Sequence, residues 1–313
     1  MPTVDLERST TLETLLSEKS RKAYCLPNHY GYQLAAARNV AIMIADLHAH
    51  GHHVIDLKPV NINVYTDKLF IAMLDCDGFS ILGGDKASGA ESIGAHFPAH
   101  QYTADYIAPE AWRSKEPPEV LGEAQDRFAL AVILFRLVNR GLHPFQGVPG
   151  TSVSHITTNQ NRIAEGLYPY GQRPHRHIQP SPWSIHEQLP KTLRTLFDQA
   201  FTSQRRPSAA QWVSALTPFT DVTTAQLQAC PKNSDHGVFA GLDCGHCAIE
   251  QQRGAVGKPS RQKRAATNTL RRNRRSATPH QQATGNAAGR ATVGTAWQGP
   301  PGAPAGRSPP RSG

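Results

Sequence analysis

The sequence of 313 residues lacks any apolar run approaching the roughly 18 to 20 residues of a membrane-spanning helix. Its N-terminus, MPTVDLERSTTLETLL, also lacks the basic segment followed by an apolar segment that characterises a signal peptide. These absences argue against a membrane or secreted protein, and we expect a cytoplasmic protein with no membrane partner. Hydrophobic residues make up 39% of the chain, enough to bury a substantial core.

Acidic residues are absent beyond Glu250, whereas residues 251–313 hold 12 Lys or Arg. The whole chain has a formal net charge of +9, so residues 1–250 carry a net charge of −3. Few large apolar side chains occur beyond residue 253, and we expect a disordered basic tail over residues 254–313. Its clusters at 261–264 and 271–275 could bind nucleic acid by counterion release. A solvated extension, or sequence from an altered reading frame, is the plainer interpretation, because no aromatic residues alternate with these charges.

Cysteine is scarce, and the odd count of five argues against a disulfide framework. Three of the five lie close together, and Cys230, His236, Cys244 and Cys247 follow a C-x5-H-x7-C-x2-C spacing. Three thiolates and one imidazole are a complete tetrahedral ligand set for Zn²⁺, so the spacing predicts a structural zinc knuckle. His246 is an alternative ligand, although its position inside the C-x2-C pair disfavours it.

Apolar periodicity predicts the order of helices and strands. The run over 69–74 does not alternate, which predicts a strand buried on both faces, and residues 126–141 are apolar on nearly every side, which predicts a buried helix. The expected elements are a polar helix over residues 5–21, a long helix over 33–50 ended by Gly51, strands at 62–64 and 69–74, a long loop over 83–100, the buried helix over 126–141, and a helix pair over 189–201 and 208–216.

Side chains that suit phosphoryl transfer lie between the long helix and the second strand. Asp56, Lys58 and Asn61 are spaced two and three apart, and Asp75 follows 14 residues after the asparagine. Alone, these residues would be read as a polar surface turn. Three further motifs follow in order, namely IAPEAW over residues 107–112, DRFALA over 126–131, and QRRPSAAQW over 204–212.

Together these motifs resemble the C-terminal lobe of the protein kinase family, over about residues 5–250. The resemblance implies a mainly α (α+β) fold, with a kinase-like C-terminal lobe, a small zinc-knuckle module and a disordered tail. The D-x-D pattern at residues 75–77 and the zinc knuckle resemble those of a bacterial group of kinase-domain proteins. The expected domains are an N-terminal helix and connection over 1–32, the lobe over 33–218, the zinc module over 228–250 and the tail over 254–313.

The resemblance also assigns roles within the candidate site. Asp56 would accept the proton of the substrate hydroxyl, and Lys58 would contact the transferred phosphate. Asn61 and Asp75 would hold the magnesium of Mg-ATP. Neither Asp75 nor Asp77 is followed by the Phe-Gly of the family's D-F-G motif. We favour Asp75 over Asp77 as the metal ligand because Asp75 directly follows the apolar strand.

Other polar residues of these motifs are interpreted as structural. Glu110 and Arg206 are expected to form an ion pair that anchors the activation segment. Asp126 is expected to cap backbone amides of the catalytic loop. His52 and His53 follow a helix end, where helix-end polarity or solvation explains them better than acid–base chemistry.

The chain departs from the family pattern in two ways. Val54-Ile55-Asp56 replaces H-R-D, so activation by loop phosphorylation is not expected. The 32 residues before the long helix contain no G-x-G-x-x-G and no V-A-x-K strand. We therefore expect a truncated protein serine/threonine kinase-like protein, weakly active or inactive alone, whose protein substrate the sequence does not identify. The alternative is a pseudokinase-type scaffold or a nucleic-acid-binding module that uses the zinc knuckle and the tail.

Overall fold

The computed structural model describes residues 4–83, 96–97, 99 and 101–256. Most of the predicted loop over 83–100, and nearly all of the tail predicted to be disordered, lie outside these residues. About half of the described part is helical and its sheets are small, which confirms the predicted α+β class. None of the described helices is long and apolar enough to cross a membrane.

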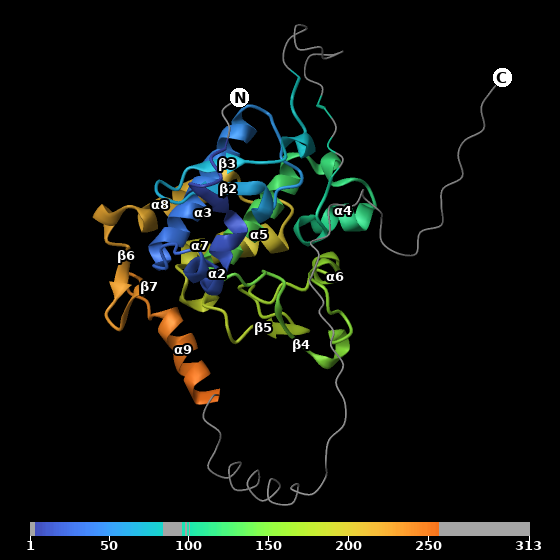
Figure 1. Cartoon of the computed structure of the whole chain (residues 1–313). Helices are drawn as coiled ribbons and strands as arrows, with labels where there is room; N and C mark the ends of the chain where they lie inside the picture. Colours follow the sequence, from blue (N-terminus) through green and yellow to red (C-terminus); the bar gives the residue numbers. More distant parts are fainter. Residues whose placement is uncertain (1–3, 84–95, 98, 100, 257–313) are drawn as a thin grey trace, which may run out of the picture.

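Two buried helices occupy the centre of the molecule (Figure 1). Helix α3 spans Tyr30–Ala49 and ends just before Gly51, which has a φ of +74° that favours glycine. Helix α5 spans Glu123–Val138 and is buried along nearly its whole length, as its apolar composition predicted. Helix α3 packs against α5 and α8 (Ala209–Thr220), and α5 also contacts α7 (Lys191–Thr202).

The N-terminal segment does not form the single helix predicted over residues 5–21. It forms strand β1 (Ser9–Thr11) and two short helices, α1 (Leu12–Leu16) and α2 (Glu18–Ala23). Ser17 separates the helices because its backbone is extended, and its hydroxyl accepts a hydrogen bond from the amide of Ser20 at 3.4 Å. A serine that caps one helix therefore ends the other.

A three-stranded antiparallel sheet has the order β1-β2-β3, with β2 at Ile62–Tyr65 and β3 at Ile71–Met73. Strand β2 lies in the centre and is largely buried, whereas β3 lies at the edge and is only half-buried. Phe70, just before β3, is 63% exposed. The prediction that this strand is buried on both faces is therefore wrong, because nothing in the described part of the chain covers its outer side.

Short elements complete the lobe and the C-terminal module. In the lobe they are the 3-10 turns Pro59–Asn61, Cys76–Gly78 and Ala104–Tyr106, helices α4 (Pro109–Ser114) and α6 (Asn159–Ala164), and the paired strands β4 (Gly147–Pro149) and β5 (Ile178–Pro180). The C-terminal module consists of strands β6 (Leu227–Cys230) and β7 (Asn233–Phe239) and helix α9 (Gly245–Val256). Figure 1 shows this module on one side of the molecule and α4 and α6 on the other.

The C-terminal module shares a core with the lobe. The ring of Tyr30, at the start of α3, meets Phe239 edge-to-face at 5.9 Å, and its hydroxyl donates to the carbonyl of Val138 at 2.7 Å. Gly237 leaves the space this ring needs, because a Cβ there would lie 2.7 Å from Tyr30 Cδ1. Phe219 of α8 contacts Phe239 at 5.0 Å. The module is thus fixed to α3 and α8 by close aromatic packing, and Tyr30 also joins α3 to the end of α5.

Candidate functional site

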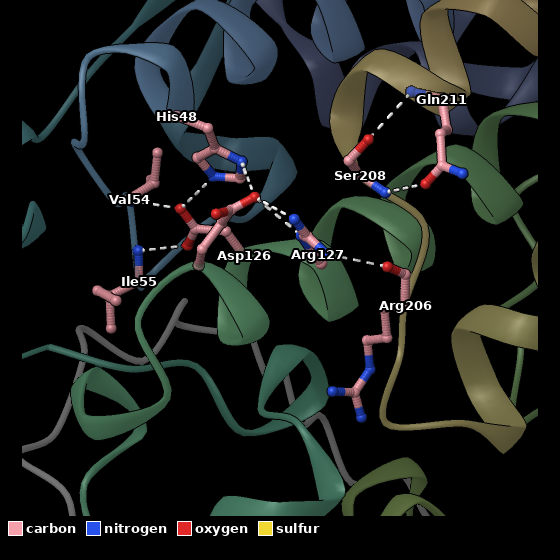
Figure 2. A network of polar contacts seen from close by, with 9 residues as sticks. His48, Val54, Ile55, Asp126, Arg127, Arg206, Ser208 and Gln211 are labelled. Atoms are coloured by element: carbon pink, nitrogen blue, oxygen red, sulfur yellow. Dashed lines mark hydrogen bonds and ion pairs between the residues drawn. The ribbon is translucent and has the colours of Figure 1, made fainter.

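Asp126, in the first turn of α5, holds the backbone of the segment that carries Asp56 (Figure 2). Its fully buried carboxylate accepts hydrogen bonds from the amides of Val54 and Ile55, both at 2.7 Å. It also lies 3.0 Å from Nε2 of His48. Ile55 has a φ of +60°, which is unfavourable for a β-branched residue, so these bonds fix a strained turn before Asp56.

Asp56, Lys58 and Thr103 form a compact triangle. The carboxylate of Asp56 is only 4% exposed, and Lys58 Nζ donates to its Oδ2 at 2.5 Å. Thr103 Oγ1 donates to Oδ1 of the same carboxylate at 2.7 Å and accepts from Lys58 Nζ at 3.1 Å. Sequence reasoning missed Thr103, since a loop threonine five residues before an A-P-E motif carries no distinguishing pattern.

Strand pairing brings the two candidate magnesium ligands to the same end of the sheet. The amide of Leu74 donates to the carbonyl of Asn61 at 2.8 Å, and Asp75 follows directly with an exposed side chain and a φ of +58°. Asp77 lies two residues further along, in the 3-10 turn, and is also exposed. The amide and carboxylate oxygens of Asn61 and Asp75 are ligands that suit Mg²⁺, and they would form a partial set completed by phosphate oxygens and water.

A buried glutamine joins this loop to the A-P-E segment. Gln125 is 1% exposed, and its Nε2 donates to the carbonyls of Tyr106 at 2.8 Å and Ile55 at 3.4 Å. Its Oε1 accepts from the amide of Ala108 at 2.9 Å. The positions of the two segments are therefore coupled through one side chain, which the sequence did not single out.

The structure brings Glu110 and Arg206 together. Nη2 of Arg206 donates to both carboxylate oxygens of Glu110, at 2.8 and 2.7 Å. The guanidinium is 4% exposed, lies 5.3 Å from the centre of the Phe128 ring and donates through Nε to the carbonyl of Ala200 at 3.2 Å. Figure 2 shows Arg127 donating to the backbone carbonyl of Arg206, at 3.2 Å. These contacts anchor the A-P-E segment to the core.

His52 and His53 serve the backbone near the site. Nδ1 of His52 accepts from the amide of Leu82 at 3.2 Å, while the backbone of His53 pairs with Ser80 through bonds of 2.9 and 2.8 Å. The ring of His53 stacks on His96 at 4.8 Å, and burial lowers its pKa. No described hydrogen bond joins either imidazole to a candidate catalytic side chain.

The four cysteine and histidine residues singled out by spacing converge at the C-terminal module. The ligand atoms of Cys230, His236, Cys244 and Cys247 all lie within 4.8 Å of one another. Sγ of Cys247 is 3.5 Å from Sγ of Cys230 and 3.4 Å from Nδ1 of His236. Tetrahedral Zn–S bonds of about 2.3 Å place two thiolates about 3.8 Å apart, so the cluster fits a zinc knuckle.

The surroundings of the cluster fit a cation. Nε2 of His236 lies 3.3 Å from the carboxylate of Glu250 and 3.2 Å from Nδ2 of Asn233, so its Nδ1 faces the thiols. Burial, and then the neighbouring thiols, raise the pKa of Cys247 to about 12, whereas a backbone hydrogen bond lowers the pKa of Cys230. A bound cation would favour the thiolate of Cys247. His246 is outside the four-ligand group and stacks on His236 at 5.1 Å.

Comparison with known proteins finds two similar curated proteins, both named protein kinase YegI. The protein of Escherichia coli O157:H7 is 30% identical over 233 residues, which cover 71% of this chain and 33% of the relative. That of Escherichia coli strain K12 is 31% identical over 232 residues, with the same coverage of both chains. The chain thus spans one third of the length of these relatives. No family model matches the chain.

This homology supports a kinase-like family for the chain, in agreement with the motifs and with the α+β fold. The Cys/His cluster is a second feature that the sequence predicted and the structure assembles.

Proposed function

We propose that this chain carries the substrate-side and metal-side half of a protein kinase's phosphoryl-transfer site. The observation that carries the proposal is the triangle of Asp56, Lys58 and Thr103, in which one buried carboxylate is oriented by an ammonium and a hydroxyl. Such a carboxylate is positioned to accept a proton from a substrate hydroxyl, and the ammonium to contact phosphate oxygens.

The roles follow from the chemistry of each side chain. Asp56 holds a carboxylate oxygen where an incoming hydroxyl can donate, and Thr103 keeps that carboxylate from rotating. Lys58 supplies positive charge beside it, while Asn61 and Asp75 offer oxygen ligands to Mg²⁺. Bound Mg-ATP would supply the transferable phosphoryl group, and its Mg²⁺ would neutralise the negative charge of the phosphates.

The groups that cover the phosphates in complete kinases have no counterpart among the motifs of these 313 residues. We propose that this polypeptide, assayed alone, transfers phosphate slowly or not at all. Cys230, His236, Cys244 and Cys247 are proposed to bind one structural Zn²⁺, since they leave no ligand position for a substrate.

The test compares Asp56→Asn with Asp46→Asn, a matched change at an exposed carboxylate of α3. Phosphate transfer from labelled Mg-ATP to a mixture of dephosphorylated proteins is measured for each. We expect Asp56→Asn to lower any transfer by about 10²-fold or more and Asp46→Asn to leave it unchanged. Transfer that survives Asp56→Asn would contradict the assigned role.

Metal binding provides a readout that does not require turnover. Mn²⁺ bound together with ADP is followed by water-proton relaxation, in the full chain and in Asp75→Asn and Asp77→Asn. We expect the Asp75 change to weaken Mn-ADP binding and the Asp77 change to leave it nearly unaltered. The reverse result would assign the metal to Asp77.

A further inference from the structure

A cavity of about 920 Å³ lies between α1, α2, the end of α5 and the C-terminal module, within the size range of about 300–1,000 Å³ typical of small-molecule sites. It does not include any residue of the proposed phosphoryl-transfer site. Its lining is rich in charge, with six cationic side chains and four acidic ones. The cationic ones are Lys19, Arg21, Lys22, Arg136, Arg140 and Arg253.

Most of the acidic side chains are already engaged. Glu13 pairs with Arg136 at 3.0 Å, and Glu18 pairs with Lys22 at 2.6 Å. Asp235 accepts from Nδ2 of Asn28 at 3.0 Å. The remaining acidic group, on α9, faces the imidazole of a candidate zinc ligand at 3.3 Å. Cationic charge in the cavity therefore exceeds the acidic charge available to it.

Among the described residues, Arg140 makes no direct hydrogen bond or ion pair, although Glu18 and Glu250 lie near enough to favour its charge. Its side chain is half-buried and lines the cavity. Its backbone, at a φ of +60°, follows α5 directly, and the next residue, Gly141, is pressed against α1, since a Cβ there would lie 2.4 Å from the carbonyl oxygen of Leu16. The fold thus holds Arg140 at the cavity wall without a direct ion pair.

A second guanidinium, that of Arg253, lines the same cavity. Arg253 lies over the ring of Trp183 at 5.6 Å, which fixes its guanidinium. Burial lowers the pKa of Arg140 and the positive charge of Arg253 lowers it further, whereas Glu18 and Glu250 act in the opposite direction. Two guanidinium groups that line one cavity and repel one another are a poor arrangement for an empty space.

We propose that this cavity binds a small anion of the phosphate class, held between Arg140 and Arg253. A phosphate or phosphate monoester carries up to two negative charges and several acceptor oxygens, which match two guanidiniums better than one carboxylate would. The anion would relieve the repulsion between the two arginines. This site is separate from the proposed function and does not depend on it.

The test is calorimetric titration of the full zinc-loaded chain with inorganic phosphate and, in a second arm, with phenyl phosphate, at constant ionic strength. The variants are Arg140→Gln and Arg253→Gln. Arg176→Gln, at an exposed arginine that does not line the cavity, is the matched control. Lys58→Met reports any phosphate bound at the phosphoryl-transfer site. Tighter binding of phenyl phosphate identifies an ester ligand, and equal binding identifies the free ion.

We expect saturable binding in the full chain and in the Arg176 and Lys58 variants, and at least a tenfold rise in Kd for each cavity variant. Zinc content and far-UV circular dichroism verify that the variants are folded. If Arg140→Gln impairs folding, Arg253→Gln decides alone, because Arg253 is exposed on α9. The proposal is overturned if the full chain shows no saturable binding at millimolar phosphate, if the cavity variants bind as Arg176→Gln does, or if Lys58→Met abolishes binding.

Discussion

Replacing Asp126 by alanine tests whether the candidate site depends on one buried carboxylate. The substitution removes the acceptor of two amide hydrogen bonds of 2.7 Å, from Val54 and Ile55. Both amides lie in a buried segment, so each is left without a partner at a cost of about 1–3 kcal/mol. We therefore expect Asp126→Ala to lower the free energy of unfolding by about 2–6 kcal/mol.

Two further variants separate the causes. Asp126→Asn keeps one side-chain carbonyl oxygen and should lose about half as much, because one of the two amides retains its acceptor. Glu123→Ala, one turn earlier on the same helix, removes a partly exposed pair with Arg127 at 2.7 Å and a carboxylate oxygen 3.4 Å from Nδ1 of His48. This i,i+4 pair contributes only about 0.3–0.5 kcal/mol, which makes Glu123→Ala the control for general damage to α5.

The assay is urea unfolding followed by tryptophan fluorescence, with the slope of the transition checked for each variant. If Asp126→Ala costs no more than Glu123→Ala, the two amides must find other acceptors, and the argument that Asp126 fixes the strained turn at Ile55 would be wrong. If Asp126→Ala lowers the free energy of unfolding and Asp126→Asn leaves it unchanged, the cause would be lost packing around the carboxylate rather than the loss of its hydrogen bonds.

Three other outcomes follow from named contacts. Removal of metal by a chelator should release roughly one equivalent of Zn²⁺ and lower the melting temperature. Cys247→Ser should lower both the zinc content and the melting temperature, whereas Cys25→Ser, at an exposed thiol, should change neither. Burial lowers the pKa of His143 to about 3, so between about pH 6.5 and pH 3 the unfolded state binds a proton that the folded state does not. The free energy of unfolding should therefore decrease by up to about 1.4 kcal/mol for each unit by which the pH is lowered. Denaturation curves between pH 7 and 4 should show a weaker dependence of this free energy on pH in His143→Gln. Glu110→Ala leaves the buried guanidinium of Arg206 unpaired and should cost about 3–5 kcal/mol in the same unfolding assay, and a loss below 1 kcal/mol would show that solvent replaces the carboxylate.

The helices were predictable wherever burial dominated their composition. Helix α5 is apolar on nearly every side because other elements surround it. The four clustered cysteine and histidine residues were equally visible, since metal ligands require fixed residue types at short spacing.

The errors arise where a local pattern does not determine the environment. The residues before α3 are helical in composition, but the capping hydroxyl of Ser17 divides them. The run that forms β3 looks like a central strand, and only the pairing order shows that it is an edge. Thr103 and Gln125 were missed because their importance comes from partners that lie 17 to 70 residues away in the sequence.

Long-range contacts also pack the C-terminal module against the lobe. Tyr30 packs on Phe239 of the module and donates to the carbonyl of Val138 at the end of α5. The next residues of that turn, Arg140 and Gly141, form the wall of the cationic cavity. The packing of Tyr30 on the module thus links the end of α5, the module and the wall of the cavity.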